Sequence, residues 1–162
     1  MLSEKMAKSL NEQHNREIYS GYFYLGMSAY AASSGLSGFA HWFFQQWKEE
    51  LIHAKKFMDY IIKRKNRLVL LPIEEPPQDF SSGEDLFNRT LNHERNVSKL
   101  IAGLVEMAKD ENDRETCEFL QWFVKEQVEE ETTPAGILKK IRAEGKDEKA
   151  LSAIDCQLAG RK

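Results

Sequence analysis

The chain has 162 residues, of which 41% are hydrophobic, and this size predicts one globular domain over residues 1–162 with a substantial buried core. Because 23 Lys and Arg nearly balance 26 Asp and Glu, for a formal net charge of −3, no basic excess points to nucleic acid or to an anionic membrane as a partner. Cys117 and Cys156 lack C-x-x-C spacing and residues 1–10 carry three charges, so we expect a protein of the reducing cytoplasm with neither a signal peptide nor a membrane span.

Two long helices are expected in the first 65 residues. Ser3 is suited to be the N-cap of a first helix that ends at about Ser33. Residues 34–37, Ser-Gly-Leu-Ser, then supply a short turn, and a second helix follows over about 38–65. Because the turn is short, these two helices should pair antiparallel.

A long connection separates this pair from the rest of the chain. Residues 66–82 contain Pro72, Pro76 and Pro77 and little helical periodicity. Seventeen extended residues reach up to about 56 Å, whereas a helix of about 28 residues is about 42 Å long. The connection is therefore long enough to cross a whole bundle.

The second half of the chain predicts another helical pair and a short last helix. Residues 81–84, Ser-Ser-Gly-Glu, resemble a capping box that opens a third helix ending at about Asp110. Residues 112–115 open a fourth helix that ends near Glu144-Gly145, after only a short turn. The sequence thus predicts an all-α four-helix bundle over about 3–144, with one long crossover between helices two and three.

A fifth helix is expected over about 147–158. Leu151, Ile154 and Leu158 lie on one face of it at spacings of three and four residues. Such an apolar stripe must pack against another surface, either the chain's own bundle or a neighbouring copy.

A glutamate interrupts the apolar stripe of each long helix at its middle. With a spacing of seven residues, the four interrupted stripes are Leu10-Glu17-Tyr24, Phe43-Glu50-Phe57, Phe87-Glu94-Ile101 and Phe123-Glu130-Ile137. Packing the helices side by side brings the four carboxylates to about the same depth. The alternative is that each stripe is slightly misphased and its glutamate is a solvated edge residue.

Four converging carboxylates need compensation, because like charges repel strongly in a low-dielectric interior. Two divalent cations would neutralise the four charges. His53 follows Glu50 by three residues and so lies on the same helix face, where a neutral imidazole is a metal ligand. A site rich in oxygen with one imidazole favours iron or manganese, with zinc as an alternative.

These residues resemble a known family, the non-haem bacterial ferritins, over the whole chain. The matching motifs are Asn11-Glu12-Gln13, Arg16-Glu17-Ile18-Tyr19-Ser20, Glu49-Glu50-Leu51-Ile52-His53-Ala54, His93-Glu94 and, most specifically, the run from Phe119 to Glu131. The resemblance implies the fold described above and an iron centre within one subunit, and the helical-bundle carboxylate site is the general geometry of such proteins.

The resemblance also implies particular iron ligands. One iron would be held by Glu17, Glu50 and His53, and the second by Glu94, Glu130 and the shared Glu50.

Five further residues match positions around this pair of irons. Gln127 would be a neutral group beside the second iron, and Tyr24 would lie beside the centre, although core packing with a hydrogen bond to a ligand is its alternative role. Glu49, Glu126 and Glu129 match a third iron site that faces a cavity.

Departures from related families narrow the resemblance. Position 133 is Thr, so the chain lacks the second E-x-x-H of bacterioferritins, rubrerythrins and di-iron oxygenases, and it lacks the cysteine pairs of rubrerythrins. Position 51 is Leu, whereas haem-binding bacterioferritins carry a methionine there, so we expect no haem. A di-iron oxidase or peroxidase without mineral storage remains the alternative function.

The family function would be iron storage and detoxification. Fe(II) is oxidised by dioxygen or peroxide at the ferroxidase centre and kept as ferric mineral in a hollow homo-oligomeric shell of 24 subunits. The fifth helix matches the segment that gathers around the four-fold axis of such shells. Asp110, Glu111, Asp113 and Glu115 match acids near the three-fold channels, or they simply complement a helix dipole.

Overall fold

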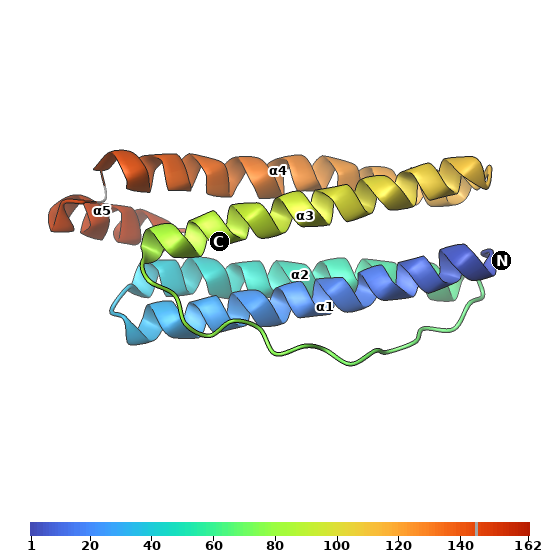
Figure 1. Ribbon diagram of the computed structural model, residues 1–162, viewed down its shortest axis with the longest axis horizontal. Coiled ribbons are helices and arrows are strands. Elements are labelled where there is room, and N and C mark those ends of the chain that lie inside the picture. The colour runs from blue at the N-terminus through green and yellow to red at the C-terminus, as the bar shows by residue number, and fades with distance from the viewer. Residues whose placement is uncertain (145) are drawn as a thin grey trace.

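The computed structural model describes residues 1–144 and 146–162, and five helices account for most of them. Their bounds are α1 Glu4–Ser33, α2 Ser37–Lys63, α3 Gly83–Asp110, α4 Arg114–Glu144 and α5 Glu148–Leu158. Helices α1 and α2 pack as one antiparallel pair, and α3 and α4 pack as the other (Figure 1). The predicted all-α bundle with one crossover and a short fifth helix is confirmed. Within the described residues, no helix has both the length and the apolar content of a membrane span.

The predicted helix starts are largely correct, with one shift in a cap. The Ser3 hydroxyl accepts a hydrogen bond from the Met6 amide, as an N-cap does. At α3 the box is closed one residue later than predicted, because Ser82 caps the Asp85 amide and the Asp85 carboxylate accepts from the Ser81 amide. Glu84, the residue predicted to close the box, instead accepts a hydrogen bond from Arg142.

Two helix ends differ from the prediction for local reasons. Helix α2 ends at Lys63, two residues early, because Lys65 adopts a left-handed φ of 59° that stops the helix. Helix α4 contains Pro134, a proline that the predicted helices did not take into account. Its ring removes one backbone donor, yet the helix continues to Glu144. The predicted stop at Gly145 lies outside the described residues.

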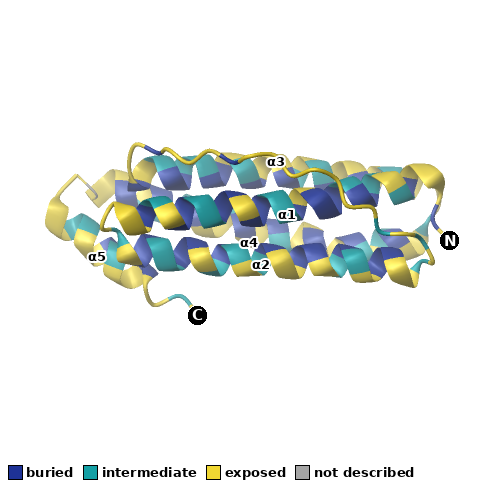
Figure 2. Ribbon diagram, turned by 90° about the horizontal axis from the view of Figure 1, so that it is seen from below, coloured by how far each residue is buried: buried dark blue, intermediate teal, exposed yellow. Residues whose placement is uncertain are grey.

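Two asparagines hold the crossover on the surface of α1. Asn11 accepts from the Val69 amide at 2.6 Å, and Asn15 accepts from the Leu71 amide at 2.9 Å. The same side chains donate back to crossover carbonyls, Asn15 to that of Val69 at 3.0 Å. The two side-chain amides thus satisfy backbone N–H and C=O groups of this extended segment, as a neighbouring strand would. The segment runs along the length of the bundle (Figures 1 and 2).

Helix α5 docks on the start of α2 in its own bundle. Ile154 and Leu158 are buried in the hydrophobic core, as the alternative of docking on the chain's own bundle predicts. Asp155 accepts a hydrogen bond from the Phe39 amide at 2.9 Å, and so α5 caps a helix that lacks a side-chain cap of its own. A Cβ at Gly38 would lie 1.7 Å from the Asp155 carbonyl oxygen, so this contact requires glycine.

The core consists of two hydrophobic clusters with polar side chains between them. One cluster contains Phe23 and Phe43 and the other contains Leu10 and Phe57, so the middles of α1 and α2 fall between the clusters. Buried residues, drawn in dark blue, recur along the long helices (Figure 2). In α4 the buried residue near the end of the stripe is Leu138, with Ile137 only partly buried, because a seven-residue spacing drifts by about 20° per repeat on a straight helix.

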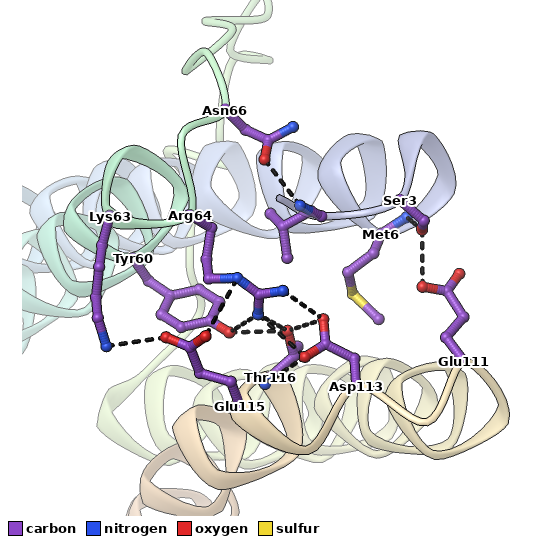
Figure 3. Close-up of polar contacts among 11 residues, drawn as sticks. Ser3, Met6, Tyr60, Lys63, Arg64, Asn66, Glu111, Asp113, Glu115 and Thr116 are labelled. Carbon is purple, nitrogen blue, oxygen red and sulfur yellow. Dashed lines mark hydrogen bonds and ion pairs between the residues drawn. The ribbon is translucent and has the colours of Figure 1, made fainter.

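A polar cluster closes the end of the bundle where α2 meets α4 (Figure 3). The Arg64 guanidinium donates two hydrogen bonds of 3.0 Å to the Asp113 carboxylate and further bonds to the Tyr60 and Thr116 hydroxyls. Asp113 also caps the Thr116 amide at the first turn of α4. Glu115 pairs with Lys63, and Glu111 accepts from Ser3. Three of the acids matched to a channel therefore have partners within the chain.

Candidate metal centre

The four mid-helix glutamates are buried at the centre of the bundle. Glu17 and Glu50 are each 2% exposed, Glu94 is 1% exposed and Glu130 is 8% exposed. The alternative that they are solvated edge residues is therefore wrong. One carboxylate comes from each of the four long helices, between the two hydrophobic clusters.

Their oxygen atoms form two overlapping groups. In the first, oxygens of Glu17 and Glu50 and a ring nitrogen of His53 all lie within 4.8 Å of one another. In the second, oxygens of Glu50, Glu94 and Glu130 lie within the same distance. Glu50 belongs to both groups. Each group could hold one metal ion, and Glu50 offers an oxygen to both groups.

The His53 imidazole also belongs to a third group, in which ligand atoms of His53, Glu126 and Glu130 lie within 4.8 Å of one another. Its Nδ1 is 3.3 Å from Glu50, three residues earlier in α2, and its Nε2 is 3.7 Å from Glu126 in α4. The ring is 3% exposed and packs edge-on against Trp122 and Phe123. This packing fixes the orientation of the imidazole.

Tyr24 and Gln127 both act on Glu94. The Tyr24 hydroxyl, fully buried among Phe23 and Phe43, donates to Glu94 Oε1. The Gln127 amide donates to Glu94 Oε2 at 3.1 Å and to the Glu94 carbonyl oxygen at 3.2 Å. Tyr24 thus has the buried position and the hydrogen bond of its alternative role, and it also lies beside the centre; Gln127 orients the same carboxylate from the other side.

Two further glutamines belong to the site, and the sequence did not single them out as site residues. Gln13 donates to Glu17 at 2.7 Å, and Gln46 donates to Glu130 at 2.6 Å. The sequence pattern that could have indicated both is a glutamine four residues before a mid-helix glutamate, as in Gln13-Glu17 and Gln46-Glu50. Only the first of these pairs forms, because Gln46 reaches across to α4.

Three carboxyl groups of this centre, those of Glu50, Glu94 and Glu130, have raised pKa values. Burial, together with the charge of Glu17, raises the pKa of Glu94 to about 7, against hydrogen bonds from Tyr24 and Gln127 that lower it. Burial, with the charges of Glu94 and Glu49, raises the pKa of Glu130 to about 8. Burial and the neighbouring carboxylates also raise the pKa of Glu50 well above its usual range. The metal-free centre thus retains protons that a bound cation would displace.

The three acids matched to a third site lie beside this centre, nearer the surface. Glu126 and Glu49 are partly exposed and Glu129 is exposed. They line a pocket of about 260 Å³ together with Glu130, which also belongs to the dinuclear centre.

The other histidines have structural contacts. His14 is buried, and its Nδ1 lies 2.9 Å from the Ala54 carbonyl oxygen. His93 lies 2.8 Å from the Ser20 hydroxyl, and burial lowers its pKa to about 4, so it stays neutral.

Comparison with known proteins identifies the family. A family model described as a ferritin-like domain matches residues 7–143. A bacterial non-heme ferritin from Bacteroides fragilis is 43% identical over 161 residues, which are 99% of this chain and all of that protein. The chain belongs to the ferritin family.

Other relatives support the same assignment for this ferritin. A bacterial non-heme ferritin from Staphylococcus epidermidis is 37% identical over 99% of this chain and 97% of its own. An open pore ferritin from the hyperthermophilic archaeon Archaeoglobus fulgidus is 47% identical, with a TM-score of 0.99 over the full length of both chains. A closed form of that ferritin, engineered by mutagenesis, has a TM-score of 0.98 over all of this chain and 99% of its own. Family membership supports iron storage as the general function, and the expected resemblance is confirmed.

Proposed function

We propose that this chain is a ferroxidase subunit that oxidises Fe(II) with dioxygen at the buried centre and stores the product as ferric mineral. One ferrous ion would be held by Glu17, Glu50 and His53, and the second by Glu94, Glu130 and the shared Glu50. This assignment agrees with the two overlapping groups of ligand atoms. Ferrous iron is the substrate here, so the site must both bind it and release it.

One observation carries the proposal: four carboxyl groups are buried together, and their hydrogen-bond partners only weakly compensate their negative charge. Their hydrogen-bond partners are the side chains of Gln13, Tyr24, Gln46, Gln127 and His53. None of these groups carries a full positive charge when the imidazole is neutral. Since burying carboxylates costs free energy unless they are paired, a fold that gathers four of them is suited to bind two divalent cations.

The donor set suits iron in both oxidation states. Carboxylate oxygens with one imidazole favour iron or manganese over metals that prefer thiolates, and their negative charge stabilises Fe(III) relative to Fe(II). Each ferrous ion gives up one electron, and dioxygen takes both electrons with two protons to form hydrogen peroxide. The raised pKa values of Glu94 and Glu130 mean that these carboxyl groups release protons when iron binds.

Gln127 favours storage over a di-iron oxidase without mineral. Its amide nitrogen is engaged by Glu94, and Thr133 stands where a second E-x-x-H would place an imidazole. The second iron would therefore have one strong ligand fewer than in an oxidase, and weaker binding lets the oxidised ion leave for a mineral. The same comparison of motifs supports a centre without haem, since Leu51 takes the position of the methionine.

Assembly into a hollow homo-oligomeric shell, with the 24 subunits implied by the resemblance, is part of the proposal. The crossover exposes four large apolar side chains, Val69, Leu70, Leu71 and Ile73, on one edge of the molecule. A contiguous exposed apolar segment is typical of a subunit interface. Cys117 and Cys156 are both free thiols, which fits the reducing cytoplasm as its compartment.

The test is anaerobic loading of the metal-free protein with Fe(II), followed by air. We expect two or three irons to bind per chain, to oxidise rapidly, and to be followed by continued uptake in a particle of about 24 subunits. Absorbance of Fe(III), iron content and particle mass are recorded on the same sample. Oxidation that stops at two irons in a small oligomer would favour the di-iron oxidase, and no oxidation would overturn both functions.

A further inference from the structure

The pocket beside the dinuclear centre contains a positive charge that belongs to the chain itself. Its wall carries the carboxylates of Glu49, Glu126, Glu129 and Glu130, and Arg161, from the segment after α5, lines it as well. Glu130 belongs to both the pocket and the dinuclear centre. A cation in the pocket is therefore next to the second iron position.

Arg161 is held in this pocket by three kinds of contact. Its guanidinium forms an ion pair of 2.5 Å with Glu49 and donates to the Trp42 carbonyl oxygen at 3.2 Å. The guanidinium carbon also lies 4.2 Å from the centre of the Trp42 ring, a cation–π contact. The Arg161 carbonyl oxygen lies 2.6 Å from the His41 ring, so its backbone is fixed from α2 as well.

A buried acceptor on the same wall lacks a donor. Gln46 is 1% exposed, and its amide nitrogen is committed to Glu130 at 2.6 Å. Among the residues that the structure describes, nothing donates a hydrogen bond to Gln46 Oε1. A buried amide oxygen without a partner costs about 1–3 kcal/mol, and a divalent cation or its bound water would satisfy it. Gln46 also lines the pocket, so its side chain supplies a buried acceptor with no donor beside the four carboxylates.

We propose that Arg161 is a tethered counter-ion, which occupies the pocket in the metal-free protein and is displaced from Glu49 when a divalent cation binds. The incoming ion takes the Glu49 carboxylate that Arg161 releases, together with Glu126 and Glu129, whose side chains line the same pocket. The inference rests on the proposed function, because the ion concerned is iron next to the dinuclear centre. Arg161 thereby keeps the third site weak, so that iron passes through it.

The test is calorimetric titration of the metal-free protein with Zn²⁺, which binds to oxygen and imidazole ligands without changing oxidation state. We expect two ions to bind tightly per chain and a third to bind more weakly. In Arg161→Ala, the third ion should bind about tenfold more tightly, with the two tight ions unchanged. Lys162→Ala is the matched control, because it removes the neighbouring exposed cation and should leave all three affinities unchanged. Glu49→Gln should weaken only the third ion.

A crystal structure of the Zn²⁺ complex gives the second readout. We expect anomalous density between Glu49 and Glu129, and the Arg161 guanidinium moved away from Glu49. An unchanged affinity of the third ion in Arg161→Ala, or zinc in the pocket with the Arg161–Glu49 pair intact, would overturn the inference and leave the dinuclear centre in place. If the unmodified protein does not bind two ions tightly, the proposed function itself is overturned, and this inference with it.

Discussion

Two clusters of charged side chains lie in the same bundle, and only one of them contains a cation that neutralises its carboxylate. At the end of the bundle, the carboxylate of Asp113 faces the guanidinium of Arg64 in a two-bond pair (Figure 3). At its middle, four carboxylates face one another with neutral hydrogen-bond donors between them. The first cluster is neutralised within the chain, whereas the hydrogen-bond partners of the second carry no full positive charge when His53 is neutral.

The pKa values of the two clusters shift in opposite directions for this reason. Burial raises the pKa of Asp113, but hydrogen bonds from Arg64 and Thr116 outweigh it and hold the pKa below its usual range. Burial and the neighbouring carboxylates together raise the pKa of Glu130 to about 8. The paired carboxylate thus adds to the stability of the folded chain, whereas burying the unpaired cluster costs folding free energy in the metal-free protein. Under the proposed function, this cost is offset when cations bind.

The largest expected effect is on oxidation. Replacing a ligand of the centre, Glu130→Ala, should slow Fe(II) oxidation at least about tenfold, since second-sphere changes alone cost that much in metal sites. Stopped-flow absorbance of Fe(III) measures it. Glu118→Ala, an exposed glutamate on the same helix, is the control and should oxidise Fe(II) at the original rate. Equal rates for the two variants would contradict the assignment of Glu130.

The next effect is on stability at the end of the bundle. Arg64→Ala leaves Asp113 without its cationic partner, and both side chains are largely buried, at 11% and 14% exposed. We expect the free energy of unfolding of the metal-free protein to fall by about 2–3 kcal/mol, measured by urea denaturation. Lys55→Ala, which breaks an exposed pair with Asp59, should change it by less than about 1 kcal/mol. Similar losses in both variants would show that the Arg64 cluster is not special.

The two clusters should also give opposite dependences on pH. Between about pH 4.5 and 8, folded Glu94 and Glu130 bind more protons than the unfolded chain does, because their pKa values are raised to about 7 and about 8. The stability of the metal-free protein should therefore fall as pH rises through this window. Asp113, whose pKa is lowered, adds stability that is lost only in acid, as pH falls below its usual value. Denaturation midpoints measured at pH 5 and pH 8 test the first sign, and an increase toward pH 8 would contradict it.

The smallest expected effect is on the stability of the metal-free protein, and it separates charge repulsion among the glutamates from side-chain packing. Glu130→Gln keeps the size of the side chain and an acceptor for Gln46, but it removes one charge from the cluster. At pH 8, we expect the free energy of unfolding of the metal-free variant to equal that of the original protein or to exceed it by up to about 1 kcal/mol. Its free energy of unfolding should also depend less on pH. Thermal unfolding with a chelator present measures it. Marked destabilisation would show that the Glu130 carboxylate is required for packing.

Much of the site was predictable from the sequence because helical periodicity is local. Glu17, Glu50, Glu94 and Glu130 each follow an apolar residue by seven positions, and a helix of known length then sets their depth. The resemblance to ferritins added the division of these residues into two ligand sets. The structure places the same atoms in those two groups, although their role as iron ligands stays a prediction.

Contacts between distant parts of the chain were not predictable in this way. The sequence placed Gln46 on α2, but only packing against α4 directs its amide to Glu130, 84 residues away. Asp155 caps α2 across 116 residues, and Arg161 reaches Glu49 across 112. Such contacts leave no periodic pattern in the sequence, because each joins two single residues that are far apart along the chain.

The sequence by itself therefore determined the number, length and buried face of the helices and the depth of the four glutamates, since these follow from spacing along one helix. The tertiary structure decided which oxygens share a site, which amides hold them and which cation of the chain lies beside them. The physical reason is that burial, hydrogen bonding and electrostatic compensation depend on distances across the bundle, and those distances exist only once the helices have packed.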